Sequence, residues 1–174
     1  LDGKEMVVTD RGNFTADLII LSAGVVPNSD LGKAAGLLIG RSGGIIVNEH
    51  LVTSEPSIYA VGDCAESLNP LSPDCRFLPL GSVSTKMGRI AADNISGRPV
   101  KFTGSIGTTM FKVFDISVAR TGLGEVDAKR QGIDYESAVV TGLDRTHYYA
   151  GADYVVLKLV ADRKTKRILG ASGY

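Results

Sequence analysis

The hydrophobic and polar positions of the first half of the chain predict several short strands. Apolar runs at residues 5–9, 45–47 and 58–61 have strand character, and each is bounded by turn-forming residues. Residues 16–22 form a longer run of β-favouring apolar side chains without polar alternation. That pattern is typical of a strand buried on both faces.

Two segments of the first half instead have helical features. Asn28 or Ser29 can cap a helix that extends to Ala35. Residues 82–96 carry apolar side chains at helical spacing, which predicts an amphipathic helix with one buried face. The apolar side chains of that face are Val83, Met87 and Ile90.

The second half of the chain has a different pattern of apolar and polar residues, which predicts a mainly antiparallel sheet with a helix across it. Its apolar stretches alternate with polar positions and are separated by turn signals. The expected strands are residues 110–118, 119–123, 135–141, 154–160 and 167–171, and the expected helix is residues 125–131. Residues 68–79, with three prolines, are expected to form a loop, and residues 98–107 a linker between two units.

One short stretch of the first half has candidate chemistry. The run 58–61 ends in Gly62 and Asp63. A glycine there lets the backbone approach a ligand, because no β-carbon intervenes, and a carboxylate accepts hydrogen bonds from sugar-like hydroxyls. On these residues alone, a buried strand that ends in an aspartate turn is the competing interpretation.

Composition narrows the possible functions. The chain has 174 residues with 44% hydrophobic and 22% charged side chains, as in a soluble globular protein. Basic and acidic residues balance at 19 each, so no global field favours nucleic acid or an anionic membrane, and no apolar run approaches the ~20 residues of a membrane span. The chain has only two cysteines, Cys64 and Cys75, and two isolated histidines, so neither a metal site nor a disulfide scaffold is expected. The lack of a disulfide scaffold favours a reducing, cytoplasmic compartment.

Three blocks in this order resemble the flavin- and pyridine-nucleotide-dependent disulfide oxidoreductases. Residues 16–28 resemble the segment where that family's NAD domain returns the chain to its FAD domain. Residues 53–63 are similar to the family's second FAD motif. Residues 78–89 resemble the helix whose start faces the flavin ring. The resemblance implies FAD and NAD(P)H as cofactors.

The resemblance also implies roles for individual residues. Asp63 would accept hydrogen bonds from the ribityl hydroxyls of FAD, with Gly62 permitting close approach. The stretch Leu80, Gly81 and Ser82 would place free N–H groups and the positive end of a helix at the flavin edge. Gly24 would lie near the nicotinamide nucleotide. Cys64 is interpreted as a small buried residue and Cys75 as an incidental thiol.

Within the family, the chain most resembles the branch of coenzyme A-disulfide reductases, NADH oxidases and persulfide reductases. Residues 107–115 and 147–152 carry this resemblance. It implies that Tyr148 and Tyr149 reach the partner subunit's active site in a homodimer and act in its thiol chemistry. The competing interpretation is an aromatic pair at the subunit interface.

The same resemblance predicts a piece of a longer subunit. No G-x-G-x-x-G fingerprint occurs in the chain, and the family's redox-active cysteine belongs to an upstream segment. The fold class expected is mixed α/β, with the C-terminal part of a Rossmann-like FAD/NAD(P)-binding domain followed by an antiparallel dimerisation domain. The expected boundaries are residues 1–25 for the end of the NAD domain, 26–104 for the FAD domain and 105–174 for a truncated dimerisation domain.

These inferences predict an enzyme that transfers a hydride from NAD(P)H to FAD and then to a disulfide, a persulfide or O₂. The acceptor is expected to be a small molecule, such as a coenzyme A-linked disulfide, with no nucleic acid or membrane as partner. Two alternatives remain: this chain by itself is an inactive dimerisation module, or the parent protein is an electron-transfer reductase for ferredoxin or rubredoxin. Residues 107–115 and the tyrosine pair argue against the latter.

Overall fold

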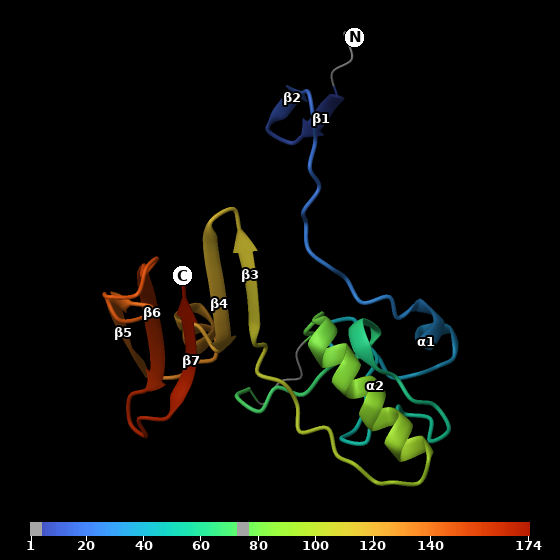
Figure 1. Cartoon of the computed structure of the whole chain (residues 1–174). Coiled ribbons are helices and arrows are strands. Elements are labelled where there is room, and N and C mark those ends of the chain that lie inside the picture. The colour runs from blue at the N-terminus through green and yellow to red at the C-terminus, as the bar shows by residue number, and fades with distance from the viewer. Residues whose placement is uncertain (1–4, 73–76) are drawn as a thin grey trace.

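The computed structural model describes residues 5–72 and 77–174, and it begins with an antiparallel hairpin (Figure 1). Strand β1 (Glu5–Thr9) pairs with β2 (Gly12–Ala16) along its whole length. The Thr9 hydroxyl donates a hydrogen bond to the Gly12 carbonyl at 2.9 Å, which closes the turn. The strand expected at residues 5–9 is therefore confirmed, as is the turn after it.

The strand expected at residues 16–22 is wrong for most of its length. After β2 ends at Ala16, residues 17–29 run without a helix or strand to α1 (Figure 1). The side chains of Leu18, Ile20 and Leu21 are 74%, 81% and 89% exposed. A strand needs a neighbour for its N–H and C=O groups, and none of the described strands pairs with this segment.

Helix α1 (Asp30–Ala34) begins after Ser29, as one of the two expected caps predicted. The Ser29 side chain makes no capping hydrogen bond to the helix, and its hydroxyl donates to the Gly43 carbonyl at 2.6 Å. Gly36 follows the helix with φ of +77°, a left-handed conformation that suits glycine. Ser29 therefore joins the start of α1 to the turn at residue 43.

The apolar runs 45–47 and 58–61 form single β-bridges rather than the expected strands. Ile45 bridges Ile39 and Ala65, and Val52 bridges Tyr59. Turns confine each pairing to one residue, since Gly43 (φ +87°) precedes the first run and a helical turn begins at Gly62. Isolated bridges still hold these segments in place, because their backbone groups are paired.

Helix α2 (Gly81–Ile95) forms the centre of the first unit and confirms the helix expected at residues 82–96. Its apolar face, Val83, Met87 and Ile90, is buried as predicted. These side chains share one core with residues from the preceding segments and from the linker. The other buried members are Leu37, Ile45, Leu51, Ala60, Ala65, Ala91 and Phe102.

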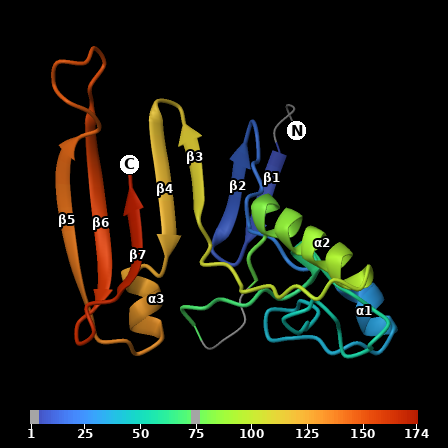
Figure 2. The ribbon, with the colours of Figure 1, turned by 60° about the horizontal axis from the view of Figure 1, so that its bottom comes forward.

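The second unit is a five-stranded antiparallel sheet in the order β3-β4-β7-β6-β5, with helix α3 (Glu125–Arg130) beside it (Figure 2). The strands are β3 (Thr109–Val113), β4 (Ile116–Gly122), β5 (Tyr135–Leu143), β6 (Tyr154–Asp162) and β7 (Ile168–Gly173). The predicted mixed fold class, with an antiparallel sheet and a helix after a helical unit, is thereby confirmed.

One predicted strand boundary in this sheet is wrong. The first strand does not continue from residue 110 to 118, because a two-residue turn at Phe114 and Asp115 divides it into β3 and β4. Phe114 has a φ of +52°, which is unusual for a residue other than glycine, asparagine or aspartate. This turn contains no glycine, so it could not be predicted from the sequence pattern.

The two units touch through the loop at residues 68–72, which precedes α2 in the chain. Leu71 packs against the core of the second unit, which consists of Leu123, Ala128, Val160 and Leu169. The Ser105 N–H donates to the Leu68 carbonyl at 2.9 Å. The expected linker at residues 98–107 is thus held to the loop at residues 68–72.

Two glycines in the sheet provide a test of this packing. A β-carbon on Gly170 of β7 would lie 2.3 Å from the Leu123 carbonyl oxygen, and backbone cannot move aside as a side chain can. We therefore expect Gly170→Ala to lower the free energy of unfolding by about 3 kcal/mol or more. Urea denaturation measures the change.

The matched control is Gly142→Ala in β5, where no atom lies within 4 Å of the added carbon. It should change stability by no more than about 0.5 kcal/mol. Equal stability of the two variants would contradict the close β4–β7 approach.

Candidate functional site

A short helical turn positions the aspartate that the sequence singles out. Val61 is extended, and the 3₁₀ turn η1 (Gly62–Cys64) follows it directly. Gly62 has a φ of +76°, which L-residues with a β-carbon rarely adopt. The sharp change of direction at Gly62 leaves the Asp63 side chain exposed to solvent.

Asp63 lies beside the first turn of α2. Its Oδ1 atom accepts a hydrogen bond from the Ser84 hydroxyl at 3.0 Å. The structure thus brings together Asp63 and the helix start, which are 21 residues apart in the chain. The sequence interpretation missed Ser84, although its position in the first turn of a predicted ligand-facing helix was a usable signal.

The N-terminus of α2 is open. Leu80 is extended at the cap position, no side chain caps the helix, and its first turn holds no acidic residue. Among the described residues, the N–H groups of Gly81 and Ser82 have no acceptor, whereas those of Val83 and Ser84 bond to the Leu80 carbonyl. Free N–H groups and the positive end of the helix dipole favour an electron-rich group at this place.

The buried carboxylate of Glu66, two residues after η1, anchors the segment that follows Asp63. Glu66 is only 7% exposed, and its Oε1 atom accepts hydrogen bonds from the Ser42 N–H at 3.0 Å and hydroxyl at 2.6 Å. Gly40 and Gly44 leave the space for this side chain, since a β-carbon on Gly40 would lie 2.1 Å from its carboxylate. The Ile45 N–H donates to the Cys64 carbonyl at 2.8 Å, which ties η1 to the same turn.

Of the two cysteines, Cys64 lies within the described residues and Cys75 does not. Cys64 is half-buried, packs against the core of the first unit and donates its thiol to the Val61 carbonyl at 3.4 Å. The small residue that was expected to be buried is thus only partly buried, at the edge of that core.

Gly24 belongs to the extended segment 17–29 and not to the pair formed by η1 and α2. Its φ is +92°, and no atom lies within 4 Å of the place where a β-carbon would be. The backbone there is open to close approach. Its assignment to a nicotinamide nucleotide stays a prediction.

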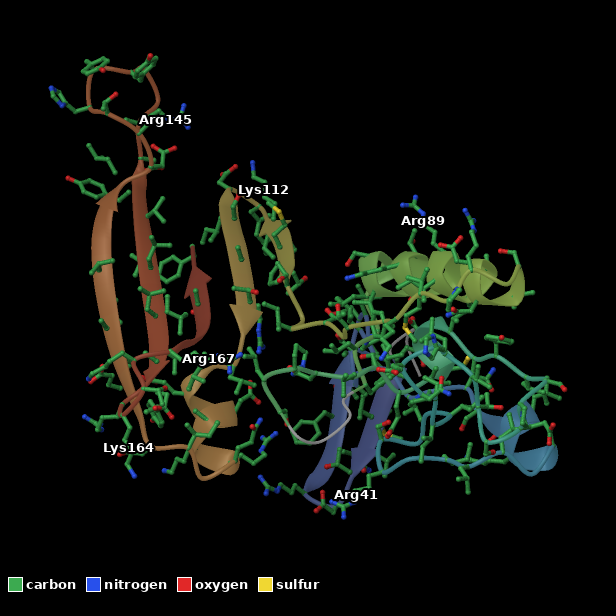
Figure 3. All side chains as sticks on the ribbon, turned by 90° about the horizontal axis from the view of Figure 1, so that it is seen from below. Arg41, Arg89, Lys112, Arg145, Lys164 and Arg167 are labelled. Carbon is green, nitrogen blue, oxygen red and sulfur yellow. The ribbon has the colours of Figure 1, made fainter. Side chains whose placement is uncertain are left out.

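Tyr148 and Tyr149 lie on the loop that joins β5 to β6, at residues 144–153. They are 74% and 61% exposed, their ring centroids are 5.2 Å apart, and His147 makes an edge contact with Tyr148. Figures 2 and 3 show that this loop extends beyond the end of the sheet, with Arg145 labelled at its base, far from α2. Within this chain the tyrosines are therefore remote from Asp63.

Asp144 closes the base of that loop. Its Oδ2 atom accepts from Nε and Nη2 of Arg145, at 2.9 and 2.6 Å, and its Oδ1 accepts the Asp153 N–H at 3.1 Å. The pKa of the Asp144 carboxyl is lowered, first by the Arg145 hydrogen bond and then by that of the Asp153 N–H. The ionised carboxylate is the form that holds the loop.

Residues 5–72 and 77–174 contain neither a metal-binding cluster nor a membrane-spanning helix. In these ranges, no cluster of three or more histidine, cysteine, aspartate or glutamate side chains could hold a metal ion. No described helix combines the length and the apolar character needed to cross a membrane.

Comparison with known proteins defines the class to which this fold belongs. Residues 2–89 match the family model described as "Pyridine nucleotide-disulphide oxidoreductase". Residues 108–174 match that family's dimerisation domain. The chain is therefore a member of the pyridine nucleotide-disulphide oxidoreductase family, as the three sequence blocks predict.

Individual relatives agree with that assignment. The chain is 40% identical over 169 residues to the "NAD(P)H sulfur oxidoreductase (CoA-dependent)" of Pyrococcus abyssi, covering 97% of this chain and 38% of that protein. It superposes on the NAD-dependent persulfide reductase from A. fulgidus with a TM-score of 0.91 and 40% identity, over 97% of this chain and 31% of the other. The chain thus spans little more than a third of the curated relative.

A third similarity concerns the cofactor. The structure of a FAD-dependent pyridine nucleotide-disulphide oxidoreductase from Desulfovibrio vulgaris matches with a TM-score of 0.82 and 36% identity. The match covers 99% of this chain and 41% of that one.

The lowered pKa of Asp144 predicts a pH dependence of the tyrosine loop. A carboxyl whose pKa is lower in the folded loop stabilises it above the ordinary value of 3.8, and this stabilisation is lost as the pH falls through the lowered folded pKa. We expect the Asp153 amide resonance to report that transition in an NMR titration. Asp144→Asn should abolish the transition, and an unchanged titration in this variant would contradict the assignment.

Proposed function

We propose that the protein carrying this chain is a flavoprotein reductase that uses NAD(P)H to reduce a small-molecule disulfide or persulfide. One observation carries the proposal: the Asp63 carboxylate lies beside the open N-terminus of α2. The pair offers acceptors for hydroxyl groups next to donors for an electron-rich ring edge. FAD presents this combination in its ribityl chain and flavin ring.

The residues of η1 fit the ribityl portion of FAD. One oxygen of Asp63 accepts the Ser84 hydroxyl, and the exposed carboxylate retains lone pairs for further donors. Gly62 would let those hydroxyls come close to the backbone. When FAD is bound it supplies the hydride chemistry, so the part of these residues is to hold and orient it.

The first turn of α2 fits the flavin edge. The free N–H groups of Gly81 and Ser82 would donate to it, and Leu80 would lie at the entry to the helix. Negative charge that develops on the ring during reduction would be stabilised by these donors and by the helix dipole. Gly24 would provide a surface for close approach of the nicotinamide nucleotide.

We propose that the chain divides into three parts. We assign residues 1–25 to the end of an NAD(P)H-binding domain, 26–104 to an FAD-binding domain and 105–174 to a dimerisation domain. The family matches at residues 2–89 and 108–174 support a boundary near the linker. A homodimer in a reducing, cytoplasmic compartment is the expected setting.

The acceptor is proposed to be a thiol-derived compound linked to coenzyme A. The names of the Pyrococcus and A. fulgidus relatives support this class, and molecular oxygen is the competing acceptor. Tyr148 and Tyr149 would reach the active site of the partner subunit, since their exposed loop extends away from the first unit of their own chain. A phenol hydroxyl there could donate a proton or hydrogen bond to a departing thiolate.

Removal of the Asp63 carboxylate tests the flavin site. In the full-length protein, we expect Asp63→Ala to weaken FAD binding about tenfold or more, because hydrogen bonds to a charged acceptor are lost. The ratio of flavin to protein after purification and an FAD titration of the apoprotein measure this. Asp30→Ala removes an exposed carboxylate from α1 and should retain full FAD content.

The tyrosines require a test that separates the two half-reactions. If either phenol acts on the acceptor, Tyr148→Phe or Tyr149→Phe should slow oxidation of the reduced enzyme by coenzyme A disulfide at least about tenfold. Reduction of the flavin by NAD(P)H should not change. Stopped-flow absorbance follows both steps.

Tyr154→Phe is the matched control, because Tyr154 is also exposed but lies at the start of β6, outside the loop. Normal oxidation rates in both Tyr148→Phe and Tyr149→Phe would contradict a role in the thiol chemistry and leave the two tyrosines as an interface contact.

A further inference from the structure

Ser84 bonds to Asp63 and lies next to Gly62, the two residues of the proposed ribityl site. Its hydroxyl oxygen lies 3.0 Å from Asp63 Oδ1 and 3.2 Å from the Leu80 carbonyl oxygen. A β-carbon on Gly62 would lie 3.3 Å from the same hydroxyl oxygen. Ser84 therefore fills the space between η1 and the first turn of α2.

The Ser84 hydroxyl has one proton and two acceptors within reach, the Asp63 carboxylate and the Leu80 carbonyl. Donation to Asp63 is favoured. The Leu80 carbonyl already accepts the N–H groups of Val83 and Ser84, at 2.9 and 3.0 Å. A carboxylate is also the stronger acceptor, because its hydrogen bonds are charge-assisted. The Ser84 proton is thus directed at Asp63.

The hydrogen bond from Ser84 restrains the Asp63 side chain, which could otherwise bond to the N-terminus of α2. The N–H groups of Gly81 and Ser82 have no acceptor in residues 5–72 and 77–174, and the positive end of a helix attracts a nearby carboxylate. An unrestrained Asp63 would turn towards them and cap the helix itself. It would then occupy the donors that a ligand needs and withdraw its own oxygens from sugar hydroxyls.

We propose that Ser84 is a positioning residue that holds the Asp63 carboxylate away from the α2 N-terminus, so that acceptor and donors stay available to different parts of one ligand. This inference rests on the proposed function, in which the ligand is FAD. It assigns Ser84 no contact with the reacting atoms. Its effect on flavin binding must therefore pass through Asp63.

The test uses the full-length apoprotein titrated with FAD. We expect Ser84→Ala to weaken FAD binding about tenfold, as loss of a hydrogen bond to a charged group predicts. Thr85→Ala removes the exposed hydroxyl of the next residue on α2 and should leave the affinity unchanged. Ser84→Thr keeps the hydroxyl and should bind FAD normally, whereas Ser84→Val, whose side chain is isosteric with threonine but lacks the hydroxyl, should not.

A double-mutant cycle separates positioning from a general loss of structure. In the Asp63→Ala background, Ser84→Ala should have no further effect on FAD affinity, because the hydroxyl has lost the group that it positions. An equal effect in both backgrounds would overturn the inference. If Ser84→Ala fails to fold, the comparison of Ser84→Thr with Ser84→Val gives the same decision.

The outcomes also distinguish the inference from the proposed function. If Asp63→Ala itself binds FAD as well as the unmodified protein, the proposed flavin site fails, and the role of Ser84 fails with it. If Asp63→Ala weakens binding but Ser84→Ala and Ser84→Val do not, the flavin site stands and only the positioning role is refuted.

Discussion

Burial of one face of α2 is the constraint on which the first unit depends. Val83 and Met87 lie in the core, so the helix cannot shift along its axis without opening cavities. Because the same helix begins at Gly81, this packing also fixes where its free N–H groups lie. Asp63 meets that turn through a single hydrogen bond. The core therefore positions the donors, and the loop segments packed around the core bring the acceptor to them.

The loop after η1 makes the two units of the chain interdependent. It begins after the buried Glu66 of the first unit, and Leu71 packs against the core of the second unit. A backbone hydrogen bond joins Leu68 to Ser105 in the linker. A change in how the sheet packs would thus be transmitted to the segment that directly follows Asp63. The two family matches, at residues 2–89 and 108–174, lie on either side of this linker.

Elements with their own periodicity could be predicted from the sequence, and elements that depend on a partner could not. Helix α2 and the hairpin of β6 and β7 have clear patterns, and both formed where expected. Residues 16–22 have an equally clear apolar pattern but no strand beside them. At the site, Asp63 follows a recognisable motif, whereas Ser84 became visible only when the structure placed two distant segments together.

The exposed apolar segment at residues 18–26 has a consequence for how the chain behaves in isolation. It is extended, exposes Leu18, Ile20 and Leu21, and is paired with none of the described strands, which are the properties of an edge strand. Edges of this kind recruit strands from other molecules, and low charge favours such recruitment. Handled as a separate 174-residue polypeptide, the chain would tend to aggregate through this segment, and charged substitutions there would improve its solubility.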